Sequence, residues 1–299
     1  MKTILIKKLK VDGANATSAP YVIGLPSITA FMGVAHLLER ELKELGFEEI
    51  KIEGLGVVCH DLNMGTYKGS KSYVHSIIGF GQPLKKDGSR SPIIEKAKCN
   101  MTVSLLMTFS GIDSDLYEPM EGMIERLLMT KIRIAGGIIR PVSLDQIKVR
   151  DIIDDKDLYR LKSNLMPGFA LVDRTDLVEK AVKEKGLDQL DAVLDGIKVK
   201  HQCIKTSEES EEKEADFEWV SYKENSGWIV PICIGYHGIS DVKQVKNQRT
   251  YEYDHQFVES VLSLGEFKIV SRVSDIETII WKYNKEQEKN NLYLFSTKI

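Results

Sequence analysis

Six histidines and four cysteines are the residues of this 299-residue chain best suited to acid–base or metal chemistry. His36 and His60 each belong to a predicted apolar element, where an imidazole is more often packed and hydrogen-bonded than catalytic. Cys59 and His60 make half of a metal site, but no second pair follows them, and no two cysteines lie within four residues. We therefore expect no catalytic residue, no metal and no cofactor.

Motifs that mark the common enzyme classes are missing from the sequence. There is no P-loop, no GxGxxG after a predicted strand, no HExxH and no GxSxG nucleophile turn. The predicted strand at 99–109 also lacks central aromatic residues, on which RRM domains stack RNA bases. A nucleic-acid-binding role would therefore depend on loops and basic side chains.

Basic residues concentrate between Tyr67 and Lys98, where seven bases face two acids. The recurring glycines and prolines indicate a long flexible loop or hairpin, which suits either a polyanion or a purely solubilising surface. Arginine can bind phosphate bidentately and asparagine can pair with a base edge. The candidate RNA-binding residues are the bases of this segment, three polar residues of an earlier loop and two later basic clusters: Lys68, Lys71, Lys85, Lys86, Arg90; Asn15, Thr17, Ser18; Arg133, Arg140; Arg160, Lys162.

The elements that must position these residues follow from hydrophobic periodicity. Strands are predicted at 4–11, 50–60, 99–109 and 132–140, with helices at 31–45 and from Pro119 onward. The order strand, helix, strand, strand, helix, strand predicts an α+β, ferredoxin-like arrangement over residues 1–145, with the basic segment 61–98 inserted between two strands. Residues 146–299 are less regular and predict a C-terminal elaboration, including a helix capped by Asp254 and bearing Phe257 and Val261.

Composition and charge describe an ordinary globular chain, with 42% hydrophobic and 28% charged residues and a net charge of −3. An acidic run predicts a disordered loop at 206–218, and removing its net charge of −6 leaves +3 elsewhere. No apolar run reaches the roughly 18 residues that a membrane helix needs. Lys7 and Lys8 interrupt the apolar start, so we expect neither secretion nor a membrane partner, and a cytoplasmic location.

A series of short motifs runs along the whole chain. In order they are Gly13–Pro20, Gly24–Pro26, Thr29–Arg40, Gly56–His60, Val103–Leu106, Arg133–Gly137, Leu165–Val172, Trp228–Pro231, Gly235–Tyr236, Phe257–Glu259, Leu264–Glu266 and Leu292–Tyr293. Together they resemble the family of the second Csy protein, the Cas-five-like subunit of the type I-F CRISPR surveillance complex. The acidic run has a counterpart at the same place in that family.

This resemblance implies a non-catalytic, RAMP-type subunit with a ferredoxin-like palm, an inserted thumb and a C-terminal elaboration. The implied partners are the 5′ handle of the CRISPR RNA (crRNA), the large subunit as a heterodimer at the foot of the complex, the backbone subunit, target DNA through the assembled complex, and anti-CRISPR proteins. Asn15, Ser18 and Arg133 fall within matching motifs, and Arg160 and Lys162 lie just before one. The lysines of the insertion resemble those of the family only in being basic, and not position by position.

Two other functions stay open from the residues alone. Related ferredoxin-like CRISPR proteins include endoribonucleases, and this chain has histidines and tyrosines that such chemistry uses. A scaffold whose bases serve only protein neighbours is the other alternative. RNA binding that weakens steeply with salt would argue against the scaffold, because phosphate contacts release counterions.

Overall fold

The computed structural model describes residues 1–79, 84–90, 96–205, 217–248 and 250–297. Its strands are β1 (Lys2–Asn15), β2 (Thr17–Ala19), β3 (Val22–Ile23), β4 (Lys51–Met64), β5 (Thr66–Tyr67), β6 (Ser76–Ile77), β7 (Lys98–Ser110), β8 (Ile138–Ile139), β9 (Ile147–Asp151), β10 (Phe169–Asp173), β11 (Lys200–Lys205), β12 (Phe217–Tyr222), β13 (Ile229–Gly238), β14 (Val258–Ile269), β15 (Ile280–Tyr283) and β16 (Leu292–Ser296). Its α-helices are α1 (Ile28–Glu44), α2 (Tyr117–Thr130), α3 (Asp155–Leu165), α4 (Thr175–Lys185) and α5 (Gln189–Ile197). Short 3-10 helices are η1 (Ser114–Leu116), η2 (Leu144–Gln146), η3 (Val270–Arg272), η4 (Ile276–Ile279) and η5 (Lys285–Asn290).

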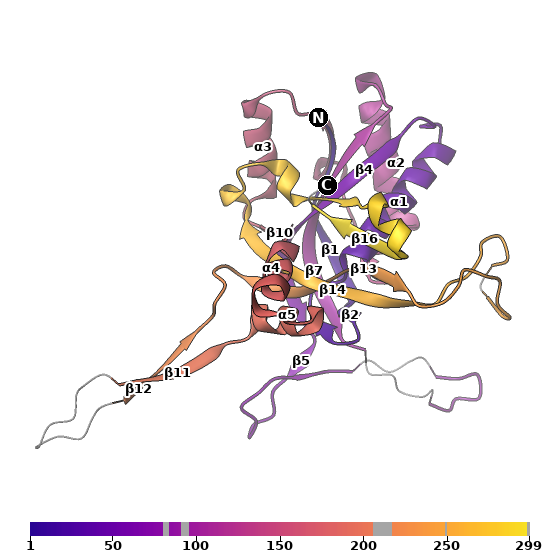
Figure 1. The fold of residues 1–299 in the computed structure, drawn as a ribbon. Coiled ribbons are helices and arrows are strands. Elements are labelled where there is room, and N and C mark those ends of the chain that lie inside the picture. Colours follow the sequence, from indigo (N-terminus) through magenta and orange to yellow (C-terminus); the bar gives the residue numbers. More distant parts are fainter. Residues whose placement is uncertain (80–83, 91–95, 206–216, 249, 298–299) are drawn as a thin grey trace, which may run out of the picture.

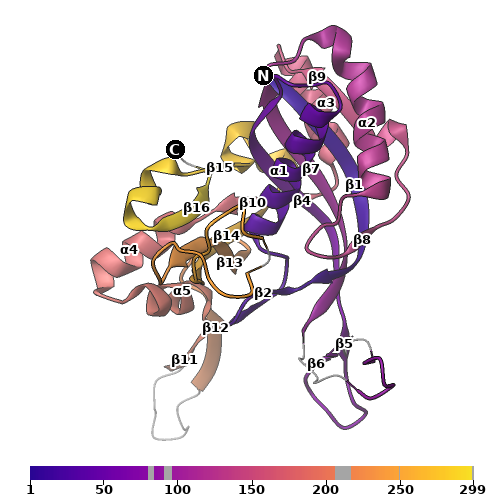
Figure 2. The same ribbon diagram turned by 90° about the vertical axis from the view of Figure 1, so that its right-hand side faces the viewer.

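One large antiparallel sheet runs through the molecule (Figures 1 and 2). Its order is β10-β14-β13-β16-β15-β4-β7-β1-β8, with β9 also paired to β1 and β10 also paired to β4. The first half of the chain contributes four adjacent strands in the order β9-β1-β7-β4. α1 contacts β4, α2 contacts β9, and the two helices contact each other. The architecture is therefore α+β, as expected.

Strand residues alternate between two cores, as the two-residue period of a strand requires. Ile4 and Ile6 of β1 pack in the core that Phe31 of α1 also enters. Leu5, between them, lies in a second core with Leu161 of α3. Both faces of the central strands are thus covered. None of the helices formed by the described residues is long and apolar enough to cross a bilayer.

The last strand of the first half is β9, Ile147–Asp151, and the prediction of a strand over 132–140 is wrong. Ala135 and Gly136 adopt left-handed backbone angles, with φ of 49° and 74°, so the chain turns where an extended strand was expected. Only Ile138–Ile139 of the predicted strand pairs with β1.

The basic insertion leaves the sheet between β4 and β7 and projects from the body of the molecule (Figures 1 and 2). The two strands stay paired as far as Met64 and Cys99, so both extend beyond the expected boundaries. The described part of the insertion holds the short β5–β6 ribbon and a turn in which Lys85 N donates to Ser89 O at 2.9 Å.

The second half of the chain extends the same sheet. β15 pairs with β4 through Trp281 and Leu55, and β10 pairs with β4 through Ala170 and Val58. α4 and α5 pack together and against β14. The acidic run predicted as a disordered loop lies outside the described residues, apart from its last two positions, which begin β12.

The predicted helix after Asp254 is wrong, because Val258–Ile269 forms strand β14. Both edges of this strand have partners, β13 on one side and β10 on the other. Backbone pairing on two sides outweighs a local apolar spacing that also fits a helix. The strand places Ser260 opposite Tyr236 of β13.

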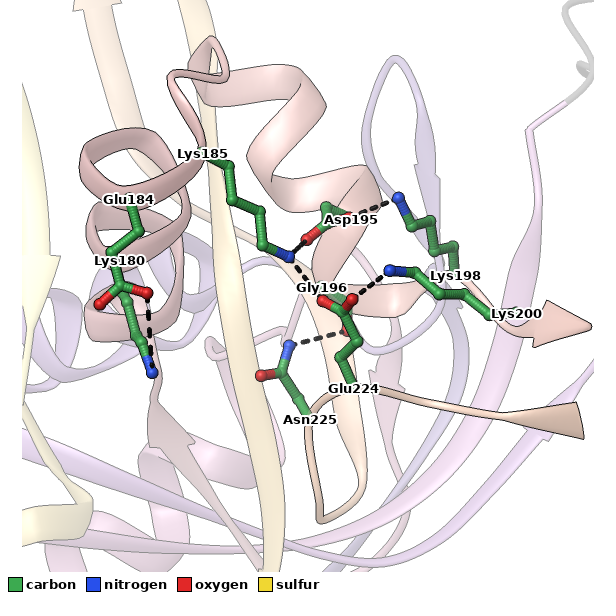
Figure 3. Close-up of polar contacts among 9 residues, drawn as sticks. All are labelled: Lys180, Glu184, Lys185, Asp195, Gly196, Lys198, Lys200, Glu224 and Asn225. Carbon is green, nitrogen blue, oxygen red and sulfur yellow. Dashed lines mark hydrogen bonds and ion pairs between the residues drawn. The ribbon is translucent and has the colours of Figure 1, made fainter. Parts of the chain in front are cut away.

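An ion-pair network holds the base of the β11–β12 hairpin to α4 and α5 (Figure 3). Lys185 Nζ lies 2.5 Å from Asp195 Oδ2 and 2.5 Å from Glu224 Oε2. Lys198 also pairs with Asp195, and Lys200 pairs with Glu224. Hydrogen bonds from Lys185 and Lys198 lower the pKa of Asp195 to about 2. The network thus joins both ends of the hairpin to the two helices.

Replacing Asp195 by Asn should lower the free energy of unfolding at pH 7 by about 1–2 kcal/mol, because two lysines lose their carboxylate. The folded pKa lies below the unfolded value of about 3.9, so this stabilisation is present above pH 4 and is lost as the pH falls toward 2. Urea unfolding of the unaltered chain and of Asp195→Asn should show that their difference in free energy of unfolding becomes smaller between pH 7 and pH 3. Glu184→Gln is the control, since its 4.0 Å pair with Lys180 is exposed and should change stability by under about 0.5 kcal/mol.

Candidate nucleic-acid interface

A groove of about 650 Å³ lies where the end of β1, the start of α1 and the strands of the second half meet. We call it the polar groove. It is lined by Asn15, Thr17, Ser18, Ala19, Pro20, Pro26, Ser27, Thr29, Ala30, Lys96, Ala135, Tyr236, Ser260 and Tyr293. Three residues predicted from the sequence, Asn15, Thr17 and Ser18, are therefore brought together on one side of a single concave surface.

Hydrogen bonds hold the Asn15–Ser18 segment in one conformation. The Asn15 side chain donates to Thr17 O at 3.0 Å and accepts from Thr17 N at 3.3 Å, which makes a local turn. Asn15 N donates to Ala135 O at 2.9 Å, and Ala97 N donates to Thr17 Oγ1 at 3.2 Å. The segment is thus tied both to the turn at Ala135 and to the end of the insertion, and Asn15 shapes this wall of the groove.

The start of α1 lines the polar groove with Ser27, Thr29 and Ala30. Ser27, the N-cap, bonds through its hydroxyl to Thr29 Oγ1 at 2.8 Å and caps no backbone N–H of the helix. The first N–H groups of a helix lack intrahelical acceptors, and the helix dipole favours negative charge there. Lys96 is exposed and adds a positive charge to the same surface. A phosphate group fits this combination.

Two tyrosines line the polar groove from the second half of the chain, and sequence reasoning missed both. Tyr236 of β13 and Tyr293 of β16 are cross-strand partners, so their rings project from the same face of the sheet. Tyr293 remains 48% exposed, with its ring 4.8 Å from that of Tyr283, and burial raises its pKa. A half-exposed neutral ring can stack on a base. The signal in the sequence was that each tyrosine belongs to one of the short motifs, Gly235–Tyr236 and Leu292–Tyr293.

The five bases predicted in the insertion, Lys68, Lys71, Lys85, Lys86 and Arg90, are all exposed. They lie on the projecting segment and do not line the polar groove. Tyr67 and Tyr73, also exposed, lie among them in the sequence. The insertion therefore combines positive charge with aromatic surface, a pairing typical of single-stranded nucleic-acid contacts.

The remaining predicted bases are dispersed. Arg133 is exposed beside the turn at Ala135. Arg140 is held by Asp12 through two hydrogen bonds, of 2.6 and 3.1 Å. Arg160 and Lys162 lie on α3, away from β2 in both views (Figures 1 and 2).

Lys162 has a structural partner within the fold. Its Nζ donates to the carbonyl of Val273 at 2.7 Å and to that of Ser274 at 3.3 Å. These bonds attach α3 to the segment before η4 and leave the ammonium only partly exposed. Arg160, two residues earlier, is exposed and lines a separate groove beside α3.

His60 has hydrogen-bond partners at both ring nitrogens. Nδ1 lies 2.6 Å from Pro167 O, which can only accept, so Nδ1 carries the proton. Nε2, 2.7 Å from Ser104 Oγ, therefore accepts from that hydroxyl, and burial lowers the His60 pKa and keeps the ring neutral. His36 is exposed on α1. Among the described residues no group of three or more His, Cys, Asp or Glu side chains is arranged to hold a metal.

Comparison with known proteins identifies the family. The family model described as CRISPR-associated protein (Cas_Csy2) matches residues 4–295. The chain belongs to the Csy2 family. It is 31% identical over 318 aligned residues to CRISPR-associated protein Csy2 of Pseudomonas aeruginosa (strain UCBPP-PA14), and the match covers 98% of this chain and 94% of that relative. The resemblance inferred from short motifs is confirmed.

The Csy2-family motifs meet at the polar groove. Its lining draws on the motifs Gly13–Pro20, Gly24–Pro26 and Arg133–Gly137 from the first half, and on Gly235–Tyr236 and Leu292–Tyr293 from the second. These segments are far apart in the sequence, and several are too short to be elements of their own. Their meeting makes this groove the strongest candidate for a functional site in this Csy2-family chain.

Proposed function

We propose that this chain is the non-catalytic RNA-binding subunit of a type I-F CRISPR surveillance complex, and that its polar groove holds the 5′ handle of the crRNA. The observation that carries the proposal is the meeting of Asn15, Thr17 and Ser18 with Tyr293 and the start of α1 on one surface. The helix start and Lys96 would bind phosphate, and the tyrosine would stack on a base. Both ring nitrogens of His60 are occupied by partners within the fold, which favours this role over an endoribonuclease.

The proposed architecture is a ferredoxin-like, RAMP-type palm in residues 1–145, completed by β9, with a thumb within 61–98 and a C-terminal elaboration in 146–299. The strand order β9-β1-β7-β4, with α1 after β1 and α2 after β7, supports the palm. The exposed bases on the projecting insertion support the thumb. The thumb would follow the RNA backbone through charge, with little sequence selectivity.

The proposed protein partners are the large subunit, in a heterodimer, and the first backbone subunit, with target DNA reached through the complex. The β11–β12 hairpin supports a protein partner. Its two strands pair only with each other among the described elements, and Trp219 and Phe217 are exposed. An isolated two-stranded hairpin is marginally stable in water, and exposed aromatic surface marks contact sites.

The first test is purification of the tagged full-length chain from cells that carry its CRISPR locus, followed by sequencing of bound RNA. We expect short RNAs that share one 5′ sequence, together with the large and backbone subunits. Clean protein without RNA or partners would contradict the proposal. Cleavage of repeat RNA by the purified chain would instead support the endoribonuclease.

Tyr293→Ala should weaken binding of handle RNA by about 1–3 kcal/mol, or roughly 5- to 150-fold, because one base loses its stacking surface. The measurement is fluorescence anisotropy with handle RNA and with an RNA of scrambled sequence. Binding of both RNAs should weaken, because stacking on a tyrosine depends little on the identity of the base. Tyr251→Ala, an exposed tyrosine outside the groove, is the matched control and should bind like the unaltered chain. Equal affinities for both variants would remove Tyr293 from the site.

A further inference from the structure

A second groove, of about 240 Å³, lies between α3 and the strands β1 and β9. We call it the basic groove. Lys7 of β1 and Lys148 and Arg150 of β9 project onto its floor, because alternate residues of a strand share one face. Arg160 and Asn164, one helical turn apart on α3, form its wall. The three bases of the floor and Arg160 of the wall therefore face the same space.

The bases of the basic groove are weakly paired. Among the described residues, Lys7 and Arg150 have no carboxylate within ion-pair distance. Lys148 Nζ is 3.7 Å from Glu121 Oε2, and Arg160 Nη1 is 3.7 Å from Asp157 Oδ1. Both separations exceed the roughly 2.7–2.9 Å of a charge-assisted hydrogen bond. The cationic groups thus remain available to an anion.

The two acids that line the basic groove have other partners. Asp157 Oδ2 accepts from Ile153 N at 3.2 Å, and Asp151 Oδ1 accepts from the Tyr117 hydroxyl at 3.1 Å. These bonds fix the start of α3 and attach α2 to β9. The four bases and two acids that line the groove leave a net positive charge on its surface.

We propose that the basic groove binds a backbone phosphate of single-stranded nucleic acid, at a site separate from the polar groove. Its volume is below the roughly 300–1,000 Å³ of small-molecule pockets, which suits one phosphate and part of its sugar. Two guanidinium groups, of Arg150 and Arg160, offer bidentate recognition of that phosphate. The two grooves have no lining residue in common, and α3 and β2 are well separated in both views (Figures 1 and 2).

The choice of nucleic acid over an acidic protein rests on the proposed function and on one further residue. Tyr159 precedes Arg160 on α3 and exposes 74% of its surface. Tyr159 does not line the groove, so its ring offers a stacking surface only to a base that extends beyond the groove, which a carboxylate ligand would not use. A second site of this kind would hold a nucleic-acid segment other than the one in the polar groove.

The test is the binding of a fluorescent single-stranded 12-mer of scrambled RNA to the full-length chain across a series of salt concentrations. The variant is Lys7→Gln with Arg150→Gln, and the control is Lys183→Gln with Arg126→Gln, two exposed bases outside both grooves. We expect the first variant to bind roughly tenfold more weakly at low salt. Its slope of log affinity against log salt should be smaller by about 0.7, since the contact to one phosphate is lost.

A charge-preserving variant, Lys7→Arg with Arg150→Lys, shows whether weaker binding comes from the lost charges or from a folding defect. It should keep most of the affinity and the salt slope, and circular dichroism should be unchanged for all variants. Unchanged affinity and slope in the Gln variant would overturn the proposal. Tighter binding of a polyglutamate peptide than of RNA, lost in the Gln variant, would also overturn it in favour of an acidic protein.

The two grooves can be tested independently. Phosphate contacts carry no sequence information, so the basic-groove variant should keep the preference for handle RNA over scrambled RNA. Tyr293→Ala should lower the affinity for both RNAs and keep the salt slope, because stacking involves no phosphate contact. A basic-groove variant that loses the preference would instead show that both grooves serve the same RNA segment, and the second site would be rejected.

Discussion

Trp281→Ala should lower the free energy of unfolding by about 3–5 kcal/mol. The Trp281 side chain is fully buried, and its indole N–H donates to Leu171 O at 3.0 Å. Removal leaves a cavity and an unsatisfied buried carbonyl. A domain is stable by only about 5–15 kcal/mol, so the midpoint of urea unfolding should fall steeply.

The position of Trp281 in the sheet explains why this destabilisation should also affect the polar groove. Trp281 of β15 pairs with Leu55 of β4, so it joins the second half of the sheet to the first. β15 also pairs with β16, which carries Tyr293. Trp281→Phe should lose only about 1–3 kcal/mol, because the ring still fills most of the space while the N–H is lost. Trp219→Ala, at a 71% exposed indole, is the control and should stay within about 0.5 kcal/mol.

A loss below about 1 kcal/mol for Trp281→Ala would mean that the two halves of the sheet do not depend on this contact. The second half would then unfold as a separate unit. A biphasic urea transition in the unaltered protein would point the same way.

Gly235→Ala should both destabilise the protein and weaken the binding of handle RNA. A Cβ at this position would lie 2.0 Å from Tyr293 O and 2.9 Å from Leu294 Cα, both in the neighbouring strand. Backbone atoms cannot move aside as a flexible side chain can, so β16 must shift away from β13. We expect a loss of about 1–3 kcal/mol in the free energy of unfolding.

The shift would also separate Tyr236 from Tyr293, the cross-strand pair that lines the polar groove. Affinity for handle RNA should therefore fall at least as far as in Tyr293→Ala. Gly33→Ala is the matched control. Gly33 lies in α1, and no atom lies within 4 Å of the position that a Cβ would occupy, so its change should stabilise the chain by about 0.5–1 kcal/mol. Normal handle binding by Gly235→Ala would show that strand pairing does not organise the groove.

Local sequence patterns were sufficient to predict a helix or strand where its buried side chains recur at one regular spacing. α1 is an example, with Phe31, Val34, Leu38 and Leu42 all buried at helical spacing. β4 and β7 are another, because long runs of Ile, Val and Leu favour strands that are covered on both faces. The order of the first three strands and two helices followed from these patterns alone.

Local sequence patterns gave wrong predictions where pairing with a distant strand, or a single backbone angle, decides the secondary structure. The turn at Ala135 depends on left-handed backbone angles, which an apolar pattern does not show. The fourth strand therefore forms at Ile147–Asp151 and not at the predicted 132–140. β14 is a strand because β13 and β10 supply hydrogen-bond partners on both edges. Such partners come from elsewhere in the chain, and no window of local sequence contains them.

The family, the α+β class, the basic insertion and the polar segment Asn15–Ser18 were predictable from short stretches of residues that are neighbours along the chain. The composition of the two grooves was not, because it depends on the folded chain. Tyr236 and Tyr293 meet Ser18 through pairing of β13 with β16, and Arg160 meets Arg150 through packing of α3 beside β9. Concave sites are built by contacts between segments distant in sequence, and those contacts follow from the closure of the whole sheet.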